Sequence, residues 1–201
     1  NRFDQTNAGA SVGLRKRMGD FAYWEGTYTL QMVSIDNIDS AASPLIAQEK
    51  GNYVQSKVDG RWVHDTRDSI YITRSGHKVE AGGLISGLGG DAQVWGLNAA
   101  GQQYFNLPGD TILSFEGAFS TVEKWGGTRV PIFERLFLGG ANNLRGFNFR
   151  QAGPKDNTGE PLGGGTSIYG TVEVSAPSRR PVSLTVDVAQ AGRTVTLQIP
   201  L

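Results

Sequence analysis

Hydrophobic and polar residues alternate with a period of two along most of the chain. In the segment YWEGTYTLQM, Trp24, Tyr28 and Leu30 fall on one parity, and Glu25 and Thr27 fall on the other. This period predicts β-strands with one apolar and one polar face, because successive side chains of a strand point to opposite faces. The alternation recurs further along, with apolar positions at Val54, Val58 and Trp62; Leu113, Phe115 and Phe119; Ile168, Val172 and Val174; and Val182, Leu184, Val186 and Val188.

Two architectures produce strands of this kind. A soluble sandwich buries the apolar faces, whereas a membrane barrel turns them to lipid and lines its lumen with the polar faces. Several segments run to about ten residues or more, above the five or six usual in soluble sheets. Aromatic residues near several strand ends resemble an interfacial girdle; they are Tyr23, Trp24, Trp62, Trp95, Tyr104 and Trp125. We therefore predict an all-β fold, an antiparallel up-and-down transmembrane β-barrel, with a soluble β-sandwich binder as a rival.

Turn signals such as RMGD, RSGH, GLGGD and LPGD separate about eight or nine strands. Two connections are longer, at 36–50 and at roughly 126–165. The second connection is rich in phenylalanine and leucine, which bulk water disfavours. Because loops of that length in a compact domain are usually functional or disordered, we expect this one to pack inside the mouth of a barrel.

Composition and charge exclude several classes of function. Glycine accounts for 28 of 201 residues, which disfavours a helical bundle because glycine is costly in helix interiors. Lysine plus arginine equals aspartate plus glutamate at 19 each, so the basic excess of a nucleic-acid-binding protein is missing. The sequence has no cysteine, which excludes disulfides and thiolate metal sites.

Few residues suggest catalysis or metal binding. His64 and His77 have no third histidine in ligand spacing, so we predict no metal site. Asp65 and Asp68 flank Arg67, a spacing that could suit paired catalytic carboxylates. We interpret them instead as strand-end charges near a barrel rim. The sequence therefore predicts neither an enzyme nor a cofactor.

One segment matches a known family. The stretch ERLFLGGANNLRGFNFR, followed by GPKDNTGEPLGGGTSIYGTVEVSAP, resembles the carboxy-terminal barrel of the Omp85 superfamily, most closely its BamA-type bacterial surface antigens. In that family a glycine-rich segment leads into a (V/I)RG(F/Y) tetrapeptide on the sixth extracellular loop. Leu144, Arg145, Gly146 and Phe147 match this tetrapeptide, with leucine for valine or isoleucine. The segments DTRDSIYITRSG and GLGGD also have counterparts in the family.

The resemblance implies a loop lock. In the family the loop folds back into the lumen, and its arginine pairs with carboxylates on later strands. The matching positions here are Arg145 with Glu173 and, in a degenerate match, Asp187. A guanidinium suits bidentate carboxylate pairing, Gly146 would permit a sharp turn, and Phe147 could wedge among lumenal side chains. In a partly desolvated lumen, removing one partner would leave a buried charge unpaired, at a cost of about 3–5 kcal/mol.

The resemblance also implies a function. Family members of this type fold and insert β-barrel proteins into the outer membrane of a Gram-negative-type cell envelope, without a cofactor. The implied partners are outer-membrane lipid, nascent outer-membrane β-barrel proteins and assembly-complex lipoproteins, with no nucleic acid. The alternatives are a two-partner secretion polypeptide transporter of the same superfamily and a small structural outer-membrane barrel or pore.

We expect residues 1–201 to form one transmembrane β-barrel domain, whose long loop at 126–165 carries the LRGF motif. The domain would supply about 8–9 strands of a presumed 16, a size within the known range of such barrels. The POTRA domains and the remaining strands of the family barrel are expected to lie outside this chain.

Overall fold

The computed structural model describes residues 4–39, 44–127 (without the side chain of Leu45), 129–141 and 143–176, and the backbone alone of 184–191 and 194–198. One antiparallel sheet contains nine strands in sequence order. The strands are β1 (Asp4–Arg17), β2 (Ala22–Asp36), β3 (Gly51–Asp65), β4 (Gly76–Ser86), β5 (Val94–Leu107), β6 (Thr111–Lys124), β7 (Thr166–Ser175), β8 (Leu184–Ala191) and β9 (Thr194–Gln198). Two short helices lie in connections, α1 (Pro44–Ala47) and the single-turn η1 (Ile132–Glu134).

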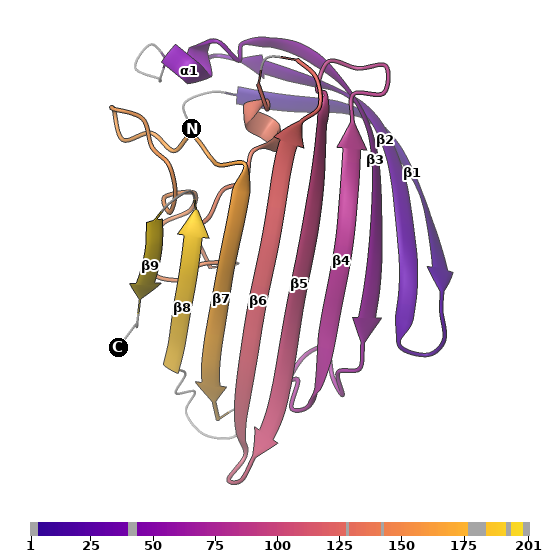
Figure 1. Cartoon of the computed structure of the whole chain (residues 1–201), viewed down its shortest axis with the longest axis vertical. Coiled ribbons are helices and arrows are strands. Elements are labelled where there is room, and N and C mark those ends of the chain that lie inside the picture. The colour runs from indigo at the N-terminus through magenta and orange to yellow at the C-terminus, as the bar shows by residue number, and fades with distance from the viewer. Residues whose placement is uncertain are drawn as a thin grey trace.

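The sheet is strongly curved and open, with β1 and β9 at its edges (Figure 1). The connections 37–50 and 125–165 lie at one end of the strands, the loop end, which is at the top of Figure 1. The β1–β2, β3–β4 and β5–β6 connections lie at the opposite, turn end. This arrangement confirms the predicted portion of an antiparallel up-and-down β-barrel. No helix in the described part of the chain is both long and apolar enough to cross a membrane.

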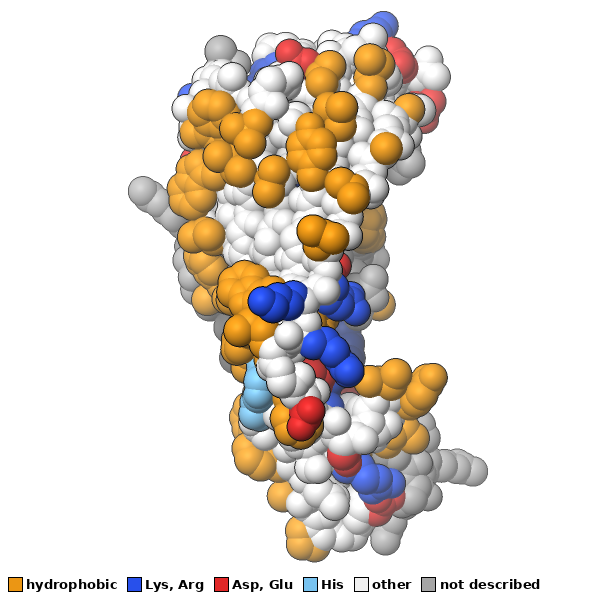
Figure 2. Space-filling model, turned by 90° about the vertical axis from the view of Figure 1, so that its right-hand side faces the viewer, with side chains coloured by type: hydrophobic (Ala, Val, Ile, Leu, Met, Phe, Trp, Pro, Cys, Tyr) orange, Lys and Arg blue, Asp and Glu red, His pale blue; other side chains and the backbone are white. Residues whose placement is uncertain are grey.

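The register separates an outer from an inner face. Residues paired directly across two strands share a face, and Trp24 pairs with Trp62, which pairs with Ala81. Side chains of this parity are exposed along the sheet, including Trp24, Tyr28, Leu30, Met32, Val54, Val58, Phe115, Phe119, Ile168, Val172 and Val174. Hydrophobic side chains cover much of the face in Figure 2. So large an exposed apolar surface is typical of the lipid-facing side of a membrane barrel.

The inner face is polar near the turn end and covered by loops near the loop end. One hydrophobic cluster joins Ile35 of β2 to Ile46 of α1 and Ile132 of η1, all at most 4% exposed. A second cluster centres on Leu138 and Leu144. Burying each such side chain contributes about 1.5–3 kcal/mol, which offsets the conformational entropy lost when the loops become ordered.

The start of β4 yields a test of the fold. Gly76 has φ +99°, and a Cβ there would lie 2.4 Å from the carbonyl oxygen of Thr66. We expect Gly76→Ala to lower the free energy of unfolding by about 1–3 kcal/mol, because both the backbone conformation and the close contact oppose a side chain. Urea unfolding of the full-length protein in detergent micelles, followed by tryptophan fluorescence, measures this loss.

The matched control is Gly101→Ala in β5. Gly101 has no positive φ, and a Cβ there meets no atom within 4 Å. We expect this variant to keep the stability of the natural protein, and an equal loss in both variants would contradict the account.

Candidate functional site

The loop 126–165 crosses the inner face of the sheet. Near its start, Ile132 belongs to the cluster that contains Ile35 of β2. Further along, Leu144 belongs to the cluster against which Tyr169 of β7 packs. Ile35 and Tyr169 both lie on the parity opposite to the exposed apolar face. The loop therefore spans the concave side of the sheet from β2 to β7.

Backbone contacts join the two limbs of this loop. Isolated antiparallel bridges join Leu136 to Gly164 and Leu138 to Ala152. The Arg135 guanidinium adds to them, because it donates to the carbonyl oxygens of Val130 at 3.0 Å and Leu162 at 3.1 Å. The loop is thus an ordered substructure with its own hydrogen bonds.

The LRGF motif forms the tight tip of the loop. Leu144 is 1% exposed and anchors the tip, and Phe147 packs against the same cluster. Gly146 has φ +83°, a left-handed conformation that favours glycine. The Gly140 N–H donates to the carbonyl oxygens of Leu144 at 3.2 Å and Phe147 at 3.0 Å, which closes the turn.

Arg145 projects from this tip to β7. Its Nη1 lies 2.7 Å from Oε2 of Glu173, within the range of a charge-assisted hydrogen bond. The backbone of Asp187, the other predicted partner, pairs with Thr171 in the β7–β8 ladder. The side chain of Asp187 lies outside the described residues.

The exposure of the pair differs from the sequence-based expectation. The Arg145 side chain is 51% exposed and that of Glu173 is 23% exposed. A half-exposed ion pair contributes about 0.2–1 kcal/mol, because water screens it and competes for both groups. The expected loss of about 3–5 kcal/mol belongs to more fully desolvated pairs and stays a prediction for Arg145.

A more buried ion-pair cluster joins the two long loops, and no pattern in the sequence predicted it. The Glu49 carboxylate, 3% exposed, lies 3.0 Å from Nε of Arg129 and 3.6 Å from Nη2 of Arg135. Arg129 also donates to the side-chain oxygen of Gln48 at 2.8 Å and to its carbonyl at 2.9 Å. The side chains of Arg129 and Arg135 are 35% and 20% exposed, so removing Glu49 would leave two partly solvated guanidinium groups without their carboxylate.

Glu134 lies between the loop and β3. It accepts a hydrogen bond from the side chain of Gln55, and Nζ of Lys57 lies 4.0 Å from its carboxylate. The Glu134 side chain is 8% exposed. Burial is the largest influence and raises the pKa of Glu134 above its ordinary value, although Lys57 and Gln55 act in the opposite direction.

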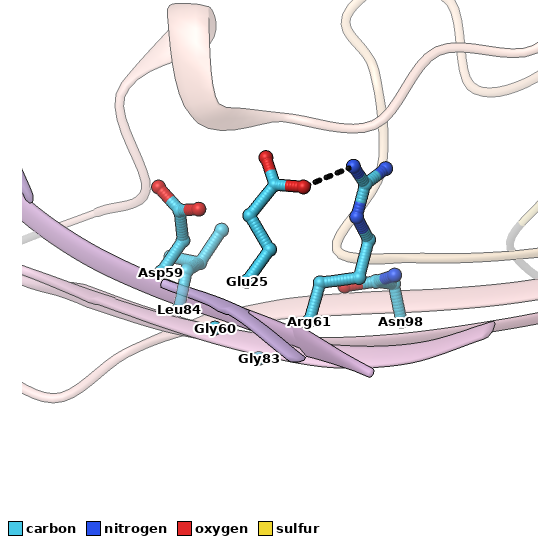
Figure 3. Close-up of a pocket in the computed structure, with 7 residues that line it drawn as sticks. All are labelled: Glu25, Asp59, Gly60, Arg61, Gly83, Leu84 and Asn98. Atoms are coloured by element: carbon cyan, nitrogen blue, oxygen red, sulfur yellow. Dashed lines mark hydrogen bonds and ion pairs between the residues drawn. The ribbon is translucent and has the colours of Figure 1, made fainter. Parts of the chain in front are cut away.

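The inner face below the loop carries a charged cleft of about 310 Å³. Figure 3 shows Glu25, Asp59, Arg61 and Asn98 on the same side of the sheet. Glu25 Oε2 lies 3.3 Å from Nη2 of Arg61 and 2.7 Å from Nη2 of Arg15. These alternating charges suit a hydrated lumen, and they present no nucleophile beside a general base.

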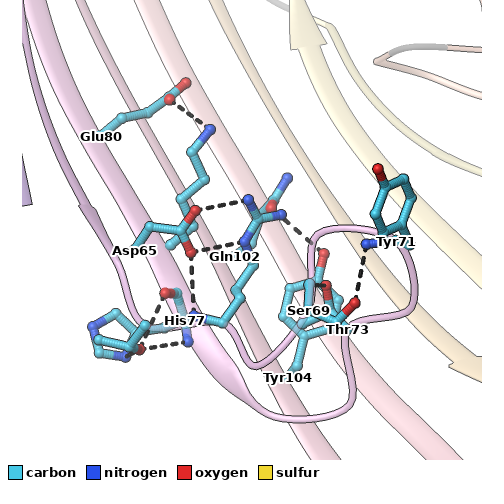
Figure 4. Close-up of polar contacts among 11 residues, drawn as sticks. Asp65, Ser69, Tyr71, Thr73, His77, Glu80, Gln102 and Tyr104 are labelled. Carbon is cyan, nitrogen blue, oxygen red and sulfur yellow. Dashed lines mark hydrogen bonds and ion pairs between the residues drawn. The ribbon is translucent and has the colours of Figure 1, made fainter. Parts of the chain in front are cut away.

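The DTRD segment builds the β3–β4 turn. Arg67 donates to both carboxylate oxygens of Asp65, at 2.9 and 2.8 Å, and this pairing raises the pKa of the Arg67 guanidinium. The Asp68 carboxylate accepts from the backbone N–H groups of Arg74 at 3.0 Å and Ser75 at 3.3 Å. These bonds lower the pKa of Asp68. Figure 4 shows the turn with its network of polar contacts, so these charges have structural partners.

The two histidines are neighbours in space. His64 Nδ1 lies 3.1 Å from His77 Nε2 at the turn end of β3 and β4. Within the described residues, no group of three or more histidine, aspartate or glutamate side chains has the geometry to hold a metal ion.

Comparison with known proteins identifies the family of this chain. The model of the Omp85 superfamily domain matches residues 1–189. The outer membrane protein assembly factor BamA of Nitratidesulfovibrio vulgaris is 25% identical over 174 residues, which cover 85% of this chain and 22% of that protein. BamA of Neorickettsia risticii is 29% identical over 164 residues, covering 81% of this chain and 22% of that protein.

A human relative and a solved structure also match the chain. The human sorting and assembly machinery component 50 homolog is 28% identical over 162 residues, covering 77% of this chain and 32% of that protein. The crystal structure of BamA from Haemophilus ducreyi lacking POTRA domains 1–3 superposes with a TM-score of 0.80 at 17% identity, over 94% of this chain and 42% of that one. The chain thus spans less than half the length of each of these proteins. Because the family model covers nearly all of its residues, the chain belongs to the Omp85 superfamily, as its LRGF motif predicted.

Proposed function

We propose that this chain is part of the barrel of an assembly factor that folds and inserts β-barrel proteins into the outer membrane of a Gram-negative-type cell envelope. The observation that carries the proposal is the ordered loop 126–165 on the inner face, with Arg145 of its LRGF tip 2.7 Å from Glu173. Support comes from relatives that bear the name outer membrane protein assembly factor. Nascent β-barrel proteins, membrane lipid and accessory lipoproteins are the proposed partners, and no cofactor is required.

The loop acts in this proposal as a brace for the curved sheet. It is anchored near β2 through Ile132 and near β7 through Leu144, so it spans the strands between them. An assembly factor has to present strand edges to an incoming chain, because strand addition uses backbone hydrogen bonds. A brace that holds the curvature of the sheet controls how such an edge is presented. Arg145, Gly146, Phe147, Glu173 and Asp187 are therefore positioning residues rather than catalytic ones.

The half-exposed pair suits a brace that has to release. Its small energetic contribution lets Arg145 and Glu173 separate without unfolding the sheet. The apolar clusters and the buried Glu49 keep the rest of the loop in place meanwhile.

The proposal predicts that the ion pair supports assembly. We expect Arg145→Lys and Glu173→Gln each to slow assembly about fivefold, the effect of about 1 kcal/mol in a rate. Lysine lacks the planar fork of arginine, so charge alone does not restore the pair. The assay follows a urea-denatured small β-barrel protein as it becomes protease-resistant in proteoliposomes that contain the full-length assembly factor.

Two further variants make this test specific. Lys155→Gln removes an exposed charge from the same loop and should leave the rate unchanged. The double variant Arg145→Glu with Glu173→Arg should recover more activity than either single reversal. Full activity in every single variant would contradict the brace. Export of an unfolded polypeptide without insertion would instead favour the secretion transporter.

The raised pKa of Glu134 predicts how the stability of the loop changes with pH. Its pKa is raised in the folded loop, so the folded state binds the proton more tightly than the open loop does. The loop therefore gains stability as the pH falls through this raised pKa towards the ordinary glutamate value. We expect proteinase K to cleave the loop more slowly at pH 5.5 than at pH 7.5, after correction with a reference peptide. Glu134→Gln should remove this difference, whereas an identical pH response in the variant would refute the assignment.

A further inference from the structure

A cavity of about 700 Å³ lies at the loop end of the sheet, where the two long connections meet β1. Its apolar walls come from Ile46, Ile132, Phe137, Phe149 and Pro161, and its polar lining comes from Gln5, Asp39, Arg150, Gln151 and Glu160. Cavities of this size with apolar walls and a few polar groups are typical of sites for small molecules. The assembly role proposed above uses neither this cavity nor its basic residue.

Arg150 is the basic residue of this lining, and two phenyl rings lie against it. Its guanidinium carbon Cζ lies 4.4 Å from the ring centroid of Phe137 and 5.2 Å from that of Phe149. Phe137 packs against the buried cluster that contains Ile132, so its ring is held in place. Attraction between a cation and ring faces positions the guanidinium without using its N–H donors.

These donors are available to a ligand. Within the residues that the structure describes, the Arg150 guanidinium forms no hydrogen bond and no ion pair. Other arginines of the same loop differ in this respect, because Arg135 lies against Glu49 and Arg145 against Glu173. A guanidinium carries five N–H donors, so Arg150 offers the cavity a set of unused donors.

The backbone places Arg150 at a conformational cost. The Gln151 N–H donates to the carbonyl oxygen of Asn148 at 3.0 Å, which closes a turn with Arg150 at its third position. Arg150 has φ +62°, and that position of such a turn favours glycine or asparagine. The Ala152 N–H then donates to the carbonyl oxygen of Leu138 at 3.0 Å and ties the turn to the other limb of the loop. The arginine is therefore presented from a fixed turn.

The lining indicates the chemistry of a ligand. The planar fork of a guanidinium matches a carboxylate or a phosphate. Asp39 and Glu160 also line the cavity, and their charges oppose a doubly charged phosphate more than a singly charged carboxylate. The Phe149 side chain is 74% exposed and offers its ring to a second aromatic group.

We propose that this cavity binds a monocarboxylate that carries an aromatic ring. The carboxylate accepts hydrogen bonds from the Arg150 guanidinium, and the aromatic ring packs against the apolar walls beside Phe149. This inference goes beyond the assembly function and requires only the packed position of the loop.

Binding to the full-length protein in lipid nanodiscs tests the site. The probe is N-acetyl-4-fluorophenylalanine, followed by the broadening of its fluorine NMR signal, with empty nanodiscs as the blank. Its carboxamide is the matched neutral probe. We expect the acid to bind about tenfold more tightly than the carboxamide, because its carboxylate forms charge-assisted hydrogen bonds.

Two variants assign this preference to Arg150. Arg150→Asn removes the cation and should abolish the preference for the acid, while asparagine tolerates the backbone of the turn. Lys155→Gln is the matched control, since it removes another exposed cation of the loop and should leave the preference unchanged. Heat-dependent mobility in gels verifies that each variant is folded.

The same chemistry occurs in a free acid and in the C-terminal residue of a peptide. A tripeptide with 4-fluorophenylalanine at its C-terminus distinguishes these sources. Tighter binding of the tripeptide than of the acetylated amino acid would assign the site to a peptide, and weaker binding would assign it to a small molecule. Either result supports the proposal if Arg150→Asn removes the binding.

Three outcomes would overturn the proposal. Equal affinity for the acid and the carboxamide would remove the contact with the guanidinium. An unchanged preference in folded Arg150→Asn, or an equal loss in Lys155→Gln, would remove the role of Arg150. Displacement of the acid by acetate or inorganic phosphate at the same concentration would show a site for free anions instead. None of these outcomes depends on assembly activity.

Discussion

A sheet that faces lipid has to satisfy its backbone hydrogen bonds internally, and the remaining features of this chain depend on that constraint. The continuous antiparallel ladder from β1 to β9 meets it along the interior strands. Such a ladder fixes the register, and the register sends alternate side chains to opposite faces. Polar groups such as Glu25 and Arg61 therefore share the inner face, which is where the long loop can find both water and partners.

The loop is held by contacts of unequal strength. Buried isoleucines and leucines, together with the Glu49 cluster, fix its position against the sheet. The Arg145–Glu173 pair is half exposed and contributes orientation rather than much stability. We infer that the loop, including Leu144 at its tip, stays packed while the Arg145 side chain can separate from Glu173.

The sequence predicted the strands, their faces and the position of the LRGF loop, because alternation and motif are local signals. It did not predict the cluster of Glu49 with Arg129 and Arg135. Those residues are far apart in sequence and meet only because the sheet curves. The sequence also did not predict the exposure of the Arg145 side chain, since that exposure depends on how tightly the tip packs. The contact between His64 and His77 depends on the β3–β4 register, which composition does not reveal.

The account rests on the loop lying inside the curved sheet with its arginine paired to β7. The most direct test is an electron cryomicroscopy structure of the full-length protein in a lipid nanodisc. The account predicts a distance of 2.7 Å, within about 0.5 Å, between the Arg145 guanidinium and the Glu173 carboxylate, with Leu144 buried. A loop outside the barrel, with Arg145 pointing to solvent and far from Glu173, would contradict it.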